Sequence, residues 1–154
     1  MKFVNDSIDD KTKYKRKEKQ MKTTELLGKR FLEHISKMET QLGEKEDELA
    51  YWEKQSLIYK EDERIAQTLK KRSEELQSMI RSLTEQKLSA TKLIDSLEDP
   101  IGRAILRRRY IFCDTWKKIA SACGKMSERN AHYIHDQALL DFEKIYCRSK
   151  AVFL

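Results

Sequence analysis

The stretch TWKKIASACGKMSERNAHYIH, residues 115–135, has the pattern of two short amphipathic helices joined at one glycine. Thr115 is suited to cap the first helix, Gly124 to end it, and Ser127 to cap the second. Apolar residues recur at steps of three and four: Trp116, Ile119, Ala120 and Cys123 in the first helix, and Ala131, Ile134, Ala138, Phe142 and Ile145 in the second. Two such helices, the second one longer, form the helix-turn-helix unit, which presents its second helix to the major groove of DNA.

The outward face of the second helix carries side chains suited to reading bases. A helical wheel at about 100° per residue places Arg129, His132, Tyr133 and Asp136 opposite the apolar stripe. Arg129 has the donor fork that binds guanine, and His132 and Tyr133 can bond or pack in the groove. Neighbouring side chains are expected to contact phosphates, which supply affinity without sequence information: Arg107, Arg108, Thr115, Lys117, Lys118, Lys125 and Ser127.

The composition favours long, solvated helices over sheets. Charged residues make up 38% of the 154-residue chain, well above the quarter typical of globular domains, and there are only four glycines and one proline. No Asn-Gly or Asp-Gly hairpin turn occurs, and no segment alternates with period two. We therefore expect an all-α protein.

Two heptad-like seams precede the helix-turn-helix unit. The first comprises Phe31, Ile35, Met38, Leu42, Leu49 and Trp52, with Lys45 interrupting it. The second comprises Ile65, Leu69, Leu76, Met79, Leu83, Ala90, Leu93 and Leu97, with Arg72 and Gln86 at its polar positions. The seams are out of phase by one residue, so we expect a turn within 56–64 and an antiparallel coiled-coil hairpin of helices roughly 50 Å long. Because no Gly or Pro marks the turn, one bent continuous helix remains an alternative.

The segment SLEDPIGR, residues 96–103, marks the end of the hairpin. Asp99 is suited to cap a new helix and Pro100 to its first turn. That helix is expected over 101–111, burying Ile105, Leu106 and Tyr110 and exposing Arg103, Arg107 and Arg108. We therefore divide the chain into a basic arm, 1–22, a hairpin for oligomerisation, 23–98, and a helix-turn-helix domain, 99–154.

The charge and cysteine content bear on partners and compartment. A net charge of +6 is compatible with a polyanionic partner, and residues 11–22 carry seven Lys or Arg against one Glu. No segment has the roughly 18 apolar residues of a membrane span, and the N-terminus lacks the apolar run of a signal peptide. Three cysteines at no disulfide-framework spacing suit a reducing compartment. We expect a cytoplasmic protein that forms a homodimer or higher oligomer.

Other chemistries fit the residues less well. Cys113, Cys123, His132 and His135 suggest zinc, but the cysteines fall in apolar helix positions that indicate buried thiols, and surface histidines are the simpler interpretation. His135 beside Asp136 lacks an accompanying nucleophile, carboxylate pair or phosphate-binding glycine loop. We therefore expect no metal, no cofactor and no enzymatic activity.

Residues 99–139, DPIGRAILRRRYIFCDTWKKIASACGKMSERNAHYIHDQAL, also resemble a known family. They are similar to the C-terminal half of the RinA/ArpU-like phage and prophage transcriptional regulators of Gram-positive bacteria, whose helix-turn-helix resembles sigma factor region 4. The matching elements are Asp99-Pro100, Arg109-Tyr110, Thr115-Trp116, Ile119-Ala120, Gly124, Ser127-Glu128-Arg129, Ile134-His135 and Ala138-Leu139. The chain departs from these patterns at Gly124-Lys125-Met126, Lys117-Lys118 and Asn130-Ala131.

The resemblance implies a regulator of phage or prophage genes in a bacterial cytoplasm, with host RNA polymerase as a further candidate partner. Carried over by position, the base-reading residues are Glu128, Arg129, His132 and Tyr133. Two rival functions remain. One is a coiled-coil adaptor that binds protein and not DNA, and the other is a DNA-recognition subunit of a phage packaging machine. In such a subunit the helix-turn-helix usually comes first along the chain, which is the reverse of the order here.

Overall fold

The computed structural model describes residues 26–152, and every element of regular structure within them is helical. This confirms the prediction of an all-α chain for the described residues. The elements are α2 (Leu27–Ile58), α3 (Glu63–Asp95), α4 (Pro100–Leu106), η1 (Arg107–Ile111), α5 (Trp116–Ala122) and α6 (Glu128–Val152). The basic segment 1–22 lies outside the described residues. None of the helices in 26–152 is long and apolar enough to cross a lipid bilayer.

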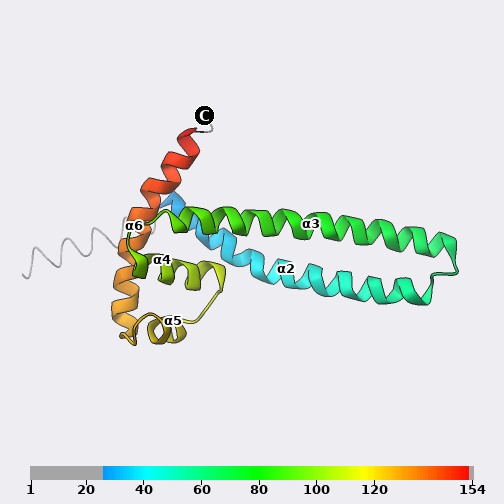
Figure 1. Cartoon of the computed structure of the whole chain (residues 1–154), viewed down its shortest axis with the longest axis horizontal. Coiled ribbons are helices and arrows are strands. Elements are labelled where there is room, and N and C mark those ends of the chain that lie inside the picture. Colours follow the sequence, from blue (N-terminus) through cyan, green and yellow to red (C-terminus); the bar gives the residue numbers. More distant parts are fainter. Residues whose placement is uncertain (1–25, 153–154) are drawn as a thin grey trace, which may run out of the picture.

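The long helices α2 and α3 run antiparallel, side by side, and residues 59–62 join them (Figure 1). The junction falls within the segment 56–64 where the sequence indicated a turn, so the alternative of one continuous helix is wrong. Asp62 caps α3, because its carboxylate accepts a hydrogen bond from the amide of Ile65 at 3.2 Å. An aspartate cap needs neither glycine nor proline beside it, and this is why the turn carries no such marker.

The buried face of α3 differs from the predicted seam. Its buried side chains in or just after the helix are Leu69, Leu76, Ala90, Ile94 and Leu97. Ile94 replaces the predicted Leu93, while Ile65 and Met79 are 37% and 42% exposed. The helix is turned so that the row through Ile65, Arg72 and Met79 lies on its flank, where the Arg72 guanidinium stays in solvent and pairs with Glu48. This part of the predicted seam was therefore wrong.

The main core lies where the inner ends of α2 and α3 meet α4, η1 and α6 (Figure 1). Its buried members are Leu32, Ile94, Leu97, Leu106, Tyr110, Ala138, Leu139 and Phe142. Beside it lies a smaller cluster formed by Ile35, Met38 and Ala90. Residues before and after the predicted boundary at 98/99 thus share one core. The hairpin and the C-terminal helices are held together by apolar burial as well as by the chain connection.

The start of α2 is fastened to the middle of α6. The carboxylate of Glu143 accepts hydrogen bonds from the amides of Leu27, at 3.2 Å, and Gly28, at 2.6 Å. These amides belong to the first turn of α2, which has no partner within its own helix and no capping side chain from Leu26. Gly28 also lies against Phe142, where a Cβ atom would come within 2.9 Å of the ring.

The chain between Pro100 and Thr115 contains one element that the sequence did not indicate. Asp99 caps α4 as predicted, accepting from the amides of Ile101 and Gly102. From Arg107 to Ile111 the helix then widens into a π-turn, η1, and is not the α-helix expected through residue 111. A π-turn closes its hydrogen bonds one residue further along than an α-turn. With Cys113 at a φ of 57°, it redirects the chain into α5.

Candidate nucleic-acid interface

The turn between α5 and α6 is built from the local signals identified in the sequence. Thr115 accepts a hydrogen bond from the amide of Lys118 at 3.3 Å, and Ser127 accepts one from the amide of Asn130 at 3.1 Å. Gly124 has a φ of 101°, a left-handed conformation that favours glycine, and Lys125 follows it at 53°. Both capping predictions and the position of the turn are confirmed.

Helices α5 and α6 each carry a small side chain on the face that is buried between them. Ala120 of α5 and Ala131 of α6 are both buried, which allows a close approach of the backbones. On α6 the predicted stripe is buried at Ala138 and Phe142 and half-buried at Ile134 and Ile145. Two further residues on this face, His135 and Leu139, are also buried and were missed.

The first two turns of α6 present the candidate base-reading residues to solvent. Glu128, Arg129, His132 and Tyr133 are all exposed, and Tyr133 is 55% exposed despite its aromatic ring. Within residues 26–152, Arg129 takes part in no ion pair, so its guanidinium is available. Asp136 was also predicted to point outward. It does so only in part, since its side chain is 36% exposed and its carboxylate lies 3.0 Å from Nδ1 of His135.

His132 lies against an aromatic and cationic stack. Its ring centroid is 3.7 Å from that of Trp116, and on the same tryptophan the Arg109 guanidinium lies 4.9 Å from the ring centroid. Cation–π and ring contacts of this kind fix side-chain orientation. The stack leaves His132 an exposed edge, while one face of its ring is occupied.

Six of the seven candidate phosphate contacts fall into three pairs. Lys117 and Lys125 are exposed and form no ion pair within 26–152. Lys118 and Arg108 both pair with the buried Asp114, at 3.3 and 3.2 Å. Thr115 and Ser127 use their hydroxyl oxygens as acceptors in the caps, which leaves each O–H free to donate. These six residues lie on or beside α5 and the turn.

Arg107 lies apart from this group. Its guanidinium is 2.6 Å from the carboxylate of Asp95, at the end of α3. Arg103, Arg107 and Arg108 are all half-buried, although the sequence indicated that they would be exposed. Because the positive charge of Arg107 is turned toward the hairpin, it is the weakest of the predicted phosphate contacts.

A buried polar group behind the helices was not foreseen. The Tyr110 hydroxyl lies 2.8 Å from Nε2 of His135, and Asp136 lies 3.0 Å from Nδ1 of the same ring. Burial lowers the pKa of His135, with Asp136 acting in the opposite direction, and burial raises the pKa of Tyr110. The only available signal was that His135 falls at a helical step between Ala131 and Ala138, on the apolar face.

Two of the cysteines, Cys113 and Cys123, do not occupy the buried positions expected of them. Cys113 is exposed and Cys123 is half-buried, while His135, expected at the surface, is buried. Cys113 lies outside a regular helix because the π-turn displaces it from the apolar face. Among residues 26–152 no group of three or more His, Cys, Asp or Glu side chains is placed to hold a metal ion.

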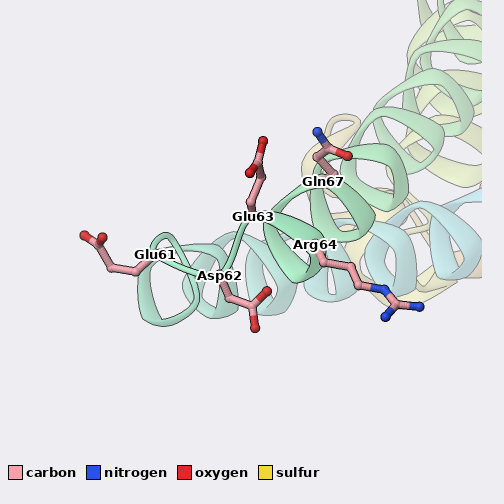
Figure 2. Close-up of a pocket in the computed structure, with 5 residues that line it drawn as sticks. All are labelled: Glu61, Asp62, Glu63, Arg64 and Gln67. Carbon is pink, nitrogen blue, oxygen red and sulfur yellow. The ribbon is translucent and has the colours of Figure 1, made fainter.

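The hollow at the far end of the hairpin does not have the features of a binding site. It is lined by Glu61, Asp62, Glu63, Arg64 and Gln67. Figure 2 shows these side chains spreading outward in different directions, with no common point at which they meet. The hollow lies at the opposite end of α3 from α6 (Figure 1). We therefore consider the start of α6 to be the candidate site.

Comparisons with protein-family models, with curated proteins and with solved structures give no match to this chain. The case for a function accordingly depends on the geometry of α5, the turn and α6.

Proposed function

We propose that this protein is a sequence-specific, double-stranded DNA-binding transcriptional regulator of phage or prophage genes. In this proposal α5 and α6 form a helix-turn-helix, and the start of α6 enters the major groove. The observation that carries it is the exposure of the first two turns of α6. Arg129 lies there without an ion pair to any residue of 26–152, next to the turn whose flanking helices are capped by Thr115 and Ser127. The resemblance of residues 99–139 to RinA/ArpU-like regulators supports the same function.

The proposed reading of bases assigns a different task to each side chain. Arg129 donates two hydrogen bonds to guanine, and Glu128 accepts one from the amino group of cytosine. Tyr133 packs or bonds in the groove beside them. His132 offers only its exposed edge, because Trp116 covers one face of its ring. We therefore expect Arg129 to contribute most of the discrimination.

The proposed phosphate contacts surround this reading face. Lys117 and Lys125 supply charge, and the free O–H groups of Thr115 and Ser127 supply hydrogen bonds to phosphate oxygens. Such contacts set the register of the protein on the duplex without selecting a sequence. Two copies of the chain, as a homodimer, would bind two half-sites. Host RNA polymerase is a further candidate partner because the resemblance extends to sigma factor region 4.

The test compares wild type and Arg129→Ala on a selected site and on a scrambled duplex, at several salt concentrations. We expect Arg129→Ala to lose about 1–3 kcal/mol of the preference for the selected site, the value of one bidentate base contact. Arg148→Ala is the matched control, because Arg148 is exposed on the same helix but far from its start. It should keep the preference. If wild type binds both duplexes equally and Arg129→Ala changes nothing, α6 does not read DNA.

The second candidate function is a coiled-coil adaptor that binds a protein partner. The observation that favours it is the exposed apolar group near the hairpin tip, comprising Leu57, Ile58 and Tyr59. Exposed apolar groups of this kind often mark protein contacts. Loss of a partner upon Leu57→Asp, with DNA binding absent in wild type, would establish the adaptor.

A further inference from the structure

The outer part of the hairpin buries little of its own apolar surface. From residue 39 to residue 83 the only buried side chains are Leu69 and Leu76. Leu42, Leu49 and Trp52, which face α3, are half-buried. Helices in water depend on the packing of an apolar face much more than on intrinsic propensity. An extension of this length therefore gains stability if a further surface covers it.

One side of this extension has the residues of an interface, and we call it the hairpin flank. Its α3 row contains Ile65, Arg72 and Met79, and its α2 row contains Gln41, Glu48 and Gln55. Residues seven apart lie on the same face of a helix, and the ion pair between Arg72 and Glu48, at 2.8 Å, places the two rows side by side. Ile65 and Met79 are exposed on it, as is Tyr51, which lies one turn from Glu48.

The hairpin flank is symmetric about Arg72. Ile65 lies seven residues before it and Met79 seven residues after it. A two-fold axis through Arg72 and Glu48 would therefore bring Ile65 of one copy against Met79 of the other. Gln55 would likewise face Gln41. An isologous dimer requires a surface that matches itself in this way.

The charges at the centre of the flank balance one another. Arg72 contacts the carboxylates of Glu48 and, at 3.4 Å, Glu75, and Lys45 lies within Coulombic reach of Glu48. Two cations and two carboxylates of each copy thus lie near the position of the axis. The axis sets Arg72 and Glu48 each beside its own copy, so the guanidinium of one copy reaches a carboxylate of the other diagonally, at Glu48 or Glu75. A partner with one strong sign of charge would find no such match.

We propose that the hairpin flank pairs with the same flank of a second copy of this chain, antiparallel, with the two-fold axis at Arg72. The inference gives a surface to the homodimer proposed above and rests on that part of the proposal. It does not depend on DNA binding. Its tests use the full chain without DNA, so their failure is distinct from a failure of base reading.

The first test measures the oligomeric state by sedimentation at micromolar concentrations. We expect wild type to sediment as a dimer, and Met79→Glu or Ile65→Glu to raise the dimer dissociation constant at least tenfold. Leu88→Glu is the matched control. Leu88 is 57% exposed on the same helix, and nine residues beyond Met79 it lies on the opposite face. It should leave the dimer intact, and circular dichroism should show equal helix content in all variants.

Two results of this test would overturn the proposal. A monomeric wild type would leave the flank without its second copy, and a different protein would then be its occupant. A dimer that resists Met79→Glu but dissociates with Leu88→Glu would place the interface on the other face.

The second test fixes the register by disulfide formation, in a chain whose Cys113, Cys123 and Cys147 are replaced by serine. A disulfide needs Cα atoms within about 7 Å. Mixing an Ile65→Cys chain with a Met79→Cys chain should therefore give a cross-linked dimer on oxidation, whereas each variant alone should give little. A Met79→Cys chain that cross-links efficiently with itself would contradict the antiparallel register.

Discussion

The Tyr110 hydroxyl and Nε2 of His135 lie 2.8 Å apart in the interior between η1 and α6. Asp136 accepts at Nδ1 of the same ring, so the proton of the neutral imidazole is on Nδ1 and Nε2 is an acceptor. Tyr110 must then donate its O–H to Nε2. A protonated His135 would have donors on both nitrogens, and the Tyr110 oxygen would then have to accept from Nε2, leaving its own O–H without this partner. Burial of the ring favours a neutral His135 in the folded protein.

The burial of His135 predicts that stability falls as the pH falls below about 6.5. Burial lowers the pKa of His135 in the folded state, whereas the unfolded chain takes up a proton near the ordinary value of about 6.5. Below that value the unfolded state binds more protons, which stabilises it by up to about 1.4 kcal/mol per pH unit. Urea unfolding between pH 8 and pH 5.5 measures the effect. His135→Gln should reduce the slope, while His34→Gln, at an exposed position, should retain it.

Gly28 and Gly43 predict opposite effects of the same substitution in one helix. A Cβ atom at Gly28 would lie 2.8 Å from a Glu143 carboxylate oxygen and 2.9 Å from the Phe142 ring, whereas at Gly43 nothing lies within 4 Å. Gly28→Ala should therefore destabilise by about 1–3 kcal/mol, as overpacking does. Gly43→Ala should stabilise by about 0.5–1 kcal/mol, the helix preference for alanine. The midpoints of thermal unfolding of the two variants, compared with wild type, test both predictions. Equal effects would mean that α2 does not dock on α6 at Gly28.

Leu139 tests whether the hairpin and the C-terminal helices unfold together. It is fully buried in the core that both share, and Leu139→Ala should cost about 2–5 kcal/mol. Trp52 in α2 and Trp116 in α5 are the only tryptophans, so Trp52→Phe and Trp116→Phe each leave one fluorescent reporter. We expect Leu139→Ala to lower the free energy of unfolding by the same amount whether it is followed at Trp52 or at Trp116. If the unfolding transition shifted only when followed at Trp116, the hairpin and the C-terminal helices would be independent domains with a boundary at 98/99.

Lys117 and Arg107 should differ in their effect on DNA binding. Each phosphate contact contributes about 0.9 to the slope of log affinity against log salt concentration. Lys117→Ala should reduce that slope by about one unit on any sequence. Arg107→Ala should leave it nearly unchanged, because Arg107 is paired with Asp95. Equal reductions would show that the Arg107 ion pair opens to reach the duplex.

The sequence predicted the local features of this fold well. The caps at Asp99, Thr115 and Ser127 and the left-handed Gly124 depend only on residues three or four positions away, and all were found. The orientation of α3 was not predictable, because it depends on packing against α2, whose contacting residues are distant in sequence.

The same reason applies at the candidate site. Arg129 and Tyr133 were identified as outward-facing from helical periodicity, and they are exposed. His135 was misplaced at the surface because histidine is intermediate in its tendency to be buried, and its residue type alone does not decide the position. Its burial depends on a hydroxyl donor 25 residues earlier, at Tyr110. The π-turn that surrounds Tyr110 has no recognised sequence signal.

The clamp of Glu143 on the first turn of α2 has a consequence for the proposed dimer and the spacing of its proposed DNA half-sites. Because it fastens the base of the hairpin to α6, the direction of the hairpin is fixed relative to the start of α6. If two copies pair about Arg72, the distance from Arg72 to Leu97, about 37 Å at 1.5 Å per residue, is counted once in each copy. The sum, about 75 Å, is the separation of the two hairpin bases, which is of the order of two turns of DNA at about 34–36 Å each. In such a dimer the length of the hairpin would set the distance between the two DNA-binding units, and so the spacing of the half-sites that the dimer can bind.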